Sequence, residues 1–233
     1  MTSIPALAPE ERPLVSASVA ALIDVAAGRS RADLRQLADS VDGSTLVSAF
    51  KLPLFVGLRV AGARRCPLSN EQVASVVDAS LTFCSRANEP LVRRLGAAVV
   101  ATLHGVGVTL APGALVAAAQ ASMSTEEYPL TTVLARAALA CPDAPMHHQA
   151  LAHGLLAVVT DDPEHRASAS ALAAQLGSEH ADIAERVRSV RPRLLPLGES
   201  DSIRQASTAL GNATLAATAQ HLLPLVEPLE ADG

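Results

Sequence analysis

Four prolines punctuate the middle of the chain at nearly equal intervals. They stand 17, 16 and 18 residues apart, each ahead of a segment whose apolar residues recur with helical spacing: Pro112, Pro129, Pro145 and Pro163. Proline is tolerated in the first turn of a helix because the amides there have no partner within the helix. One helix and one turn in about every 17 residues give one helical hairpin in about every 35. The spacing therefore predicts stacked helical hairpins.

In architecture this pattern resembles a HEAT-type α-solenoid, in which antiparallel helical hairpins stack side by side. The resemblance covers residues 88–195, the most regular part of the chain, and no tetratricopeptide or ankyrin consensus is present. A compact multi-helix bundle would produce the same punctuation and is the alternative fold. We expect a single all-α domain over residues 1–233, with about eleven or twelve helices, no sheet and a flexible tail at residues 225–233.

Capping signals fit the same pattern of helices. Three serines read as N-caps, each answered three residues later by a side chain that reaches back: Ser30 with Asp33, Ser69 with Gln72, and Ser124 with Glu127. Asp162 stands directly before Pro163 and predicts another cap. Pro53 interrupts the stretch FKLPLFVGLRVAGARR, which predicts either two short helices or one kinked helix there.

The composition limits how such helices can pack and what they can bind. Apolar residues make up 49% of the chain but aromatic residues only 2%, so the core has to be built from Ala, Leu and Val. A net charge of -5 argues against a nucleic-acid binder. Cys66, Cys84 and Cys141 are widely spaced, which favours reduced thiols in a cytoplasmic protein. One lysine against seventeen arginines is typical of a GC-rich bacterial genome.

Residues 95–125 contain no Asp, Glu, Lys or Arg and are long enough to cross a membrane. The run is interrupted by HGVGVTLAPG at residues 104–113, which contains three glycines and one proline. We therefore expect two short buried helices joined by a turn, and no membrane span. We expect no secretory signal either, because charged residues at positions 10–12 interrupt the apolar segment that it would need.

The stretch APMHHQALAHGLL carries three of the seven histidines. On a helix, where successive side chains turn by about 100°, His148 shares a face with Leu151 and Leu155, whereas His153 points to roughly the opposite side. His147 lies at the border of the apolar face, and the rings diverge around the helix. Separations of one, five and six residues do not match the three or four that a helical metal site needs. We therefore expect no metal and no cofactor, with His148 in the core or a groove and His153 solvated.

The stretch TDDPEHR is the other candidate for chemistry. Asp161 and His165 are four residues apart, which suits a small metal site, but a cap at Asp162 and a favourable dipole contact of Glu164 explain the same residues. The chain has no phosphate-binding glycine loop, no nucleophile elbow and no paired carboxylates. The sequence therefore favours a protein that is not an enzyme.

Two functions follow from these observations. The first is a non-catalytic helical-repeat scaffold or adaptor that binds another protein. Arg94, Arg136 and His153 lie in separate predicted helices and are expected to line one polar surface that faces acidic groups of the partner. The alternative is a compact all-α protein that binds or turns over a small apolar ligand in an internal pocket, with His104 or His148 as its polar group.

Overall fold

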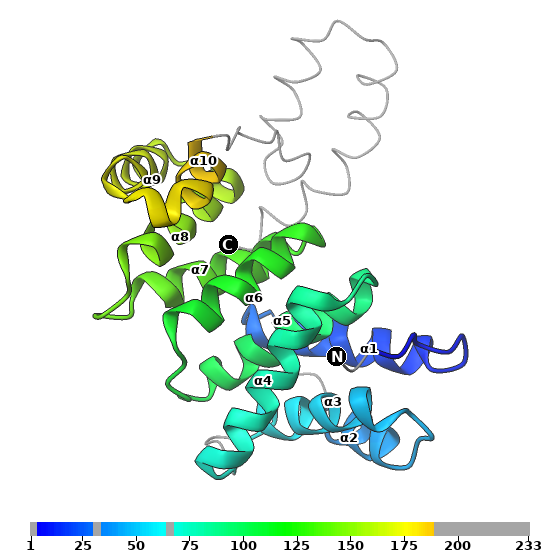
Figure 1. Cartoon of the computed structure of the whole chain (residues 1–233). Helices are drawn as coiled ribbons and strands as arrows, with labels where there is room; N and C mark the ends of the chain where they lie inside the picture. The colour runs from blue at the N-terminus through cyan, green and yellow to red at the C-terminus, as the bar shows by residue number, and fades with distance from the viewer. Residues whose placement is uncertain (1–3, 30–33, 64–67, 189–233) are drawn as a thin grey trace, which may run out of the picture. The chain divides into compact units, whose positions relative to one another are not determined.

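The computed structural model describes residues 4–29, 34–63 and 68–188 (Figure 1). These residues form ten α-helices, one 3-10 helix and no strand, which confirms the all-α prediction for this part of the chain. The helices are α1 (Arg12–Ala26), α2 (Leu34–Asp42), α3 (Ser48–Ala61), α4 (Asn70–Arg86), α5 (Pro90–Gly105), α6 (Pro112–Ser124), α7 (Tyr128–Leu139), α8 (Met146–Thr160), α9 (Pro163–Gln175), η1 (Ser178–His180) and α10 (Ala181–Arg188).

The chain divides into two units, residues 1–192 and 193–233, and every described residue belongs to the first unit. Three sequence predictions fall outside the described residues: the cap formed by Ser30 and Asp33, the thiol of Cys66, and the flexible tail at residues 225–233.

The four evenly spaced prolines mark the starts of α6, α7, α8 and α9. Pro112 and Pro163 are the first residues of their helices, Pro129 is the second residue of α7, and Pro145 is the N-cap of α8. The fixed φ of proline suits these positions, and its missing amide proton removes no helical hydrogen bond there. The interval seen in the sequence is therefore the interval between helices.

Two of the predicted caps are confirmed and one is wrong. Ser69 and Gln72 form the reciprocal capping box at the start of α4, and Asp162 Oδ1 accepts a hydrogen bond of 2.8 Å from the amide of Glu164. Ser124 instead ends α6, and α7 begins only after Glu127. A helix that began after Ser124 would place Pro129 beyond its first turn, where proline costs a hydrogen bond.

Two further sequence predictions concern breaks in the helical pattern. Pro53 lies inside one helix, α3, so the alternative of two short helices is wrong. The glycine-rich stretch after α5 is a turn, as expected: Gly107 adopts φ +86° and the amide of Val108 bonds to the carbonyl of Leu103 at 3.0 Å. Among the residues described, no helix is long and apolar enough to cross a membrane.

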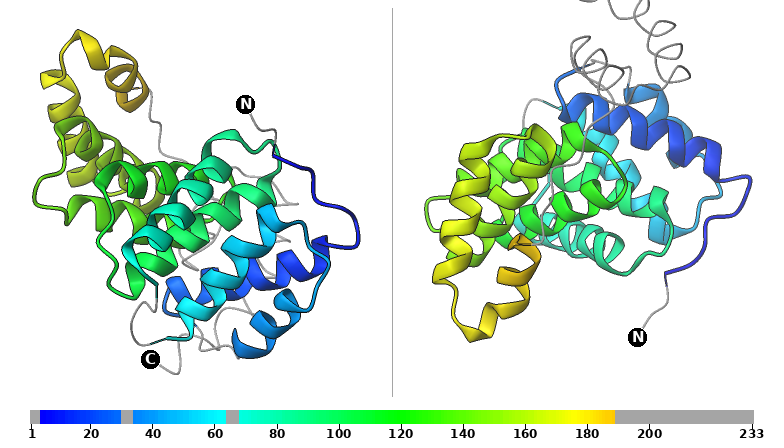
Figure 2. Two further views of the ribbon diagram at one scale, coloured as in Figure 1. Left: turned by 60° about the horizontal axis from the view of Figure 1, so that its bottom comes forward. Right: turned by 90° about the horizontal axis from the view of Figure 1, so that it is seen from above.

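From α3 onward, the helices other than α9 pack in two rows. Helices α3, α5 and α7 contact one another in sequence in one row, and α4, α6, α8 and α10 do so in the other. Each helix also packs against the next one along the chain. In Figures 1 and 2 helices that follow one another in the sequence, and therefore in colour, lie side by side. This arrangement is compatible with stacked hairpins. Helix α1 departs from it, because it packs against α3, α5 and α7.

The apolar interior consists of two clusters of very different size. The larger one extends over α1 to α8 and includes the fully buried Phe50, Leu54 and Leu95. The smaller one joins α8, α9 and α10 and is built mainly from alanines: Ala150, Ala169, Ala173, Ala184 and Val187. Because alanine buries little apolar area, α9 and α10 are held by less hydrophobic free energy than the preceding helices.

Helices α4 and α5 approach closely at Gly96. A Cβ atom at this position would lie 2.9 Å from Cys84 Sγ and would also collide with the carbonyl oxygen of Ser80. The collision with backbone cannot be relieved by a change of rotamer, so any side chain here has to push the two helices apart.

We therefore expect Gly96→Ala to lower the free energy of unfolding by about 1–3 kcal/mol, measured by urea denaturation. Gly105→Ala in the same helix is the matched control, because a Cβ atom there meets nothing within 4 Å. The control is expected to be neutral or stabilising by up to about 1 kcal/mol. If Gly96→Ala is as stable as the control, the close approach of α4 and α5 is not a constraint.

Candidate functional site

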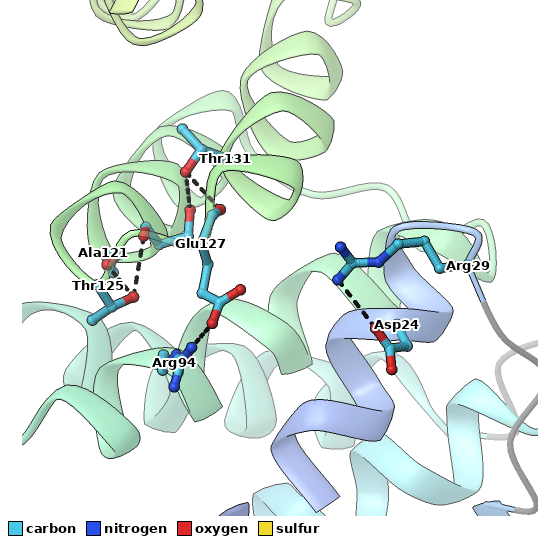
Figure 3. A network of polar contacts seen from close by, with 8 residues as sticks. Asp24, Arg29, Arg94, Ala121, Thr125, Glu127 and Thr131 are labelled. Atoms are coloured by element: carbon cyan, nitrogen blue, oxygen red, sulfur yellow. Dashed lines mark hydrogen bonds and ion pairs between the residues drawn. The ribbon is translucent and has the colours of Figure 1, made fainter. Parts of the chain in front are cut away.

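A charged groove lies between α1 and α5. Two adjoining cavities of about 200 Å³ and about 650 Å³ share Ser16, Leu91 and Arg94 in their linings. Three ion pairs lie along the groove: Arg94 with Glu127, Arg12 Nη1 with Glu89 Oε1 at 2.7 Å, and Arg29 Nη2 with Asp24 Oδ1 at 3.1 Å. Figure 3 shows the first and third of these pairs. Because each of these arginines has its own carboxylate, the groove is not suited to binding a free anion.

Arg94 is one of the predicted partner-binding residues, and it lies in this groove. Its positive charge forms an ion pair with a carboxylate of the protein itself. Its guanidinium pairs with Glu127, whose side chain is 14% exposed, whereas that of Arg94 is 40% exposed. The backbone around Glu127 is held by Thr131, whose hydroxyl donates to the Glu127 carbonyl at 3.0 Å (Figure 3). The same hydroxyl lies 2.9 Å from Ser122 Oγ. The pair therefore ties α5 to the turn between α6 and α7.

Arg136 and His153 have different neighbours from Arg94. Arg136 is exposed in the last turn of α7, where a positive charge favours the helix C-terminus. It stands nine residues after Glu127, so about 13 Å along the helix axis separate it from the Arg94 ion pair. His153 contacts His165 on α9. The shared surface of Arg94, Arg136 and His153 stays a prediction.

Three histidines meet where α8 begins. The ring centroids of His147 and His148 are 4.1 Å apart, and His147 stacks on His180 of η1 at 4.2 Å. The expectation that the rings diverge is wrong for His147 and His148, because rotation about the side-chain bonds lets adjacent rings approach. His148 also packs against α6, where a Cβ atom at Gly113 would lie 3.0 Å from its Cε1.

The pKa values of the first two histidines are lowered. Burial is the largest cause for both, since it disfavours the charged imidazolium. The charge of His180 lowers the pKa of His147 further, and the charges of His147 and His180 do the same for His148. This cluster therefore favours neutral rings and becomes less stable when they are protonated.

A second histidine contact joins α8 to α9. Nδ1 of His153 lies 2.9 Å from Nδ1 of His165, so one nitrogen donates and the other accepts, and at least one ring is neutral. Burial, followed by the charge of His165, lowers the pKa of His153. His153 is half-buried, so the expectation that it is solvated is wrong; α9 folds back over that side of α8.

The other candidate residues have structural surroundings. Asp161 pairs with Arg166 Nη2 at 2.6 Å, while the ring of His165 contacts His153 instead. Burial raises the pKa of Cys84 to about 12, so the thiol is protonated at neutral pH. In residues 4–29, 34–63 and 68–188, no group of three or more His, Cys, Asp or Glu side chains is placed to hold a metal ion.

An apolar groove of about 260 Å³ lies between α6, α8 and α10. Its lining consists of Gln120, Met123 and Ser124 from α6, Leu151, Gly154, Leu155 and Val158 from α8, and Arg186 and Val187 from α10. Neither His104 nor His148, the polar groups expected for a ligand pocket, belongs to this lining. His104 lies in the last turn of α5. The sequence indicated the apolar stripe of α8, but the contribution of α6 and α10 depends on how the helices pack.

Comparison of the chain with protein-family models, with curated proteins and with solved structures finds no match.

The ion pair between Arg94 and Glu127 gives a prediction for stability. We expect Arg94→Glu to lower the free energy of unfolding by about 1–2 kcal/mol, between the values for exposed and buried pairs, because it brings two carboxylates together. The charge-swapped protein, Arg94→Glu with Glu127→Arg, should recover part of that loss in urea denaturation. A swap that is no more stable than the single variant would show that the two charges do not interact.

The histidine contacts predict loss of stability in acid. The pKa values of His147, His148 and His153 are lowered in the folded chain, so the unfolded chain binds more protons once the pH falls below about 6.5. The contribution of these contacts to the free energy of unfolding is therefore fully present above that pH. It is completely lost once the pH has fallen below the lowered pKa values.

Because these rings join α8 to α9 and η1, amide hydrogen exchange in α9 and α10 should accelerate between pH 7.5 and pH 5, relative to α5, after correction for the intrinsic pH dependence of exchange. His153→Gln should reduce the acceleration, whereas His104→Gln, in the last turn of α5, should not. Equal acceleration in all helices would contradict this assignment.

Proposed function

We propose that the chain is a non-catalytic helical-repeat module that binds another protein as a scaffold or adaptor. The observation that carries the proposal is the two-row packing of α3 to α8 and α10, in which each helix contacts its neighbours along the chain and within its row. Stacked units of this kind leave a continuous outer face to which several helices contribute, and such faces suit extended protein partners. A HEAT-like superhelical arrangement is part of this proposal.

The surroundings of the reactive side chains support binding over catalysis. Cys84 is a buried, protonated thiol on the α4–α5 contact, and a nucleophilic cysteine would need the thiolate and access to solvent. The carboxylate of Asp161 is engaged by Arg166. His153 and His165 contact each other instead of a nucleophile.

The charges support a partner that is a protein with acidic groups. Arg136 is exposed at the end of α7 and is the predicted contact residue whose charge is best placed to meet a partner. Arg94 and His153 contribute in this proposal through the half-exposed parts of their side chains. The net charge of -5 supports a partner other than nucleic acid. We place the module in the cytoplasm of a bacterium, as the cysteine and arginine usage suggests.

One observation supports the alternative of a small apolar ligand. The groove between α6, α8 and α10 is lined mainly by apolar side chains. Its volume of about 260 Å³ is smaller than the about 300–1,000 Å³ of typical small-molecule sites. The lining of the groove also contains neither His104 nor His148. Binding of a protein partner is therefore better supported than binding of a small apolar ligand.

The test is capture of a partner from the native cells by the tagged full chain, followed by reconstitution with the purified partner. We expect Arg136→Glu to weaken the reconstituted complex about tenfold at low salt and less at high salt, with an unchanged melting temperature. Arg86→Glu is the matched control, because Arg86 is likewise an exposed arginine in the last turn of a helix. Equal effects of the two variants would refute the contact at Arg136, and the absence of any protein partner would refute the function.

A further inference from the structure

We propose that residues 163–188, the α9–α10 unit, form a pH-sensitive switch: histidine contacts hold the unit on α8 at neutral pH, and acid releases it as a whole. In the released state α1 to α8 stay folded, and the face of α8 that the unit covers becomes accessible. The inference goes beyond the proposed function and does not depend on which partner binds. It rests on how the unit is attached and on the histidines at the attachment.

The α9–α10 unit is attached to the rest of the described chain through α8. Among the preceding helices, α8 is the one against which both α9 and α10 pack. Figures 1 and 2 show the unit at one end of the described part, beside α8. The small apolar cluster contains Ala150 of α8, whereas Ala152 and Leu156 of the same helix belong to the larger cluster. Release of the unit therefore opens the small cluster and leaves the buried residues of the larger one in place.

Five of the seven histidines of the chain lie on α8, α9 and η1, and all five are half-buried: His147, His148, His153, His165 and His180. Four of them form two contacts across the boundary between α8 and the α9–α10 unit. His147 meets His180, and His153 meets His165. Histidine is the side chain whose charge changes near neutral pH, so the attachment is concentrated on groups that respond to acid.

Both contacts need uncharged rings. The hydrogen bond of 2.9 Å between Nδ1 of His153 and Nδ1 of His165 needs one nitrogen without a proton, so it is lost when both rings are charged. The rings of His147 and His180, with centroids 4.2 Å apart, repel each other when both are charged. Burial, followed by the charge of the partner ring, lowers the pKa values of His147 and His153.

The surroundings of the first contact offer no ion pair to protonated rings. The charged residues on the elements around it are all exposed: Arg136 on α7, Asp143 before α8, Glu179 in η1 and Asp182 on α10. Helix α6, which meets His148 at Gly113, contains no Asp, Glu, Lys or Arg. Within the described ranges, no ion pair joins a carboxylate to a histidine.

The second contact has similar surroundings. Asp161 pairs with Arg166, Asp162 caps α9, and Glu164 is exposed in the first turn of that helix. Beyond Asp182, α10 adds the exposed Glu185 and Arg186. Protons added to either contact therefore bring repulsion between rings without a compensating ion pair to a carboxylate.

Acid therefore favours the released state. Below a pH of about 6.5, the rings of the released unit bind protons that the contacts exclude. The attachment is complete above that pH and is lost as the pH falls through the lowered pKa values. Little hydrophobic free energy opposes the release, because the small cluster is built mainly from alanines.

Fluorescence of an introduced tryptophan tests this inference on the full chain, which contains no Trp of its own. Leu172→Trp reports on α9, because Leu172 is half-buried against the small cluster. Phe55→Trp is the matched control, since Phe55 is half-buried against the larger cluster. On going from about pH 7.5 to about pH 5, the emission of Leu172→Trp should shift to the red by at least about half of the shift produced by urea unfolding.

The red shift of Leu172→Trp should reverse when neutral pH is restored, and Phe55→Trp should shift by less than about a tenth of its own unfolding shift. If Leu172→Trp is already red-shifted at neutral pH, Leu176→Trp replaces it, because Leu176 is half-buried against the same cluster.

Two double variants in the background of the α9 tryptophan assign the transition to the histidine contacts. His147→Gln with His153→Gln removes the α8 ring of each contact, and His165→Gln with His180→Gln removes the opposite ring. Each should reduce the acid-induced red shift at least about threefold. A variant that is already red-shifted at neutral pH, with its other helices intact by circular dichroism, supports the inference as well, because loss of the ring then has the effect of protonation.

His104→Gln is the matched control, since His104 is half-buried in the last turn of α5, and it should leave the red shift unchanged. The inference is overturned if the α9 tryptophan does not respond to acid or responds irreversibly. It is also overturned if both tryptophans shift alike, which would mean that acid unfolds the whole chain, or if the double variants keep the full shift. Because no partner enters this experiment, its failure would leave the proposed function standing.

Discussion

Burial of α5 on nearly every side is the constraint on which the rest of the described structure depends. Every residue from Leu95 to Leu103 is buried, and the helix contacts α1, α3, α4, α6 and α7. A helix can be surrounded in this way only if it is apolar all round and its side chains are small enough for close approach. Gly96 and the alanines at positions 97, 98 and 101 meet that requirement, and Thr102 bonds its hydroxyl to the Ala98 carbonyl at 2.8 Å.

The scarcity of aromatic residues follows from the same packing. With 2% aromatics, the chain fills its interior with Ala, Leu and Val, and the contact between Phe50 and Phe83 is a rare exception. Small side chains allow many close helix contacts but bury little area each. The consequence is seen at α9 and α10, which are held by a small cluster of alanines, by the half-buried Leu172, Leu176 and Ile183 packed against it, and by histidine contacts to α8 and within this region.

Helix α10 also forms one wall of the apolar groove. Val187 packs in the small cluster and lines the groove, so the attachment of α10 and the shape of the groove are linked. Protonation of the histidines that join α8 to α9 and η1 would loosen the same attachment.

Local interactions explain what the sequence by itself determined. The starts of α6 to α9, the capping box at Ser69, the cap at Asp162 and the turn at Gly107 all depend on residues within a few positions of one another. Proline, glycine and short polar side chains act on their own backbone, so their effect is visible in the sequence. The failure at Ser124 shows the limit, because two competing local signals, a serine cap and Pro129, favoured different starts for α7.

The tertiary structure alone decided which distant side chains meet. The sequence placed Arg94 and His153 on polar helix faces, but it did not indicate that Glu127 and His165 would be their partners. It likewise gave no sign that α1 packs against α3, α5 and α7, or that α6 and α10 complete a groove over α8. Helical periodicity specifies a face and not the neighbour of that face, because the neighbour is set by packing among residues far apart in the chain.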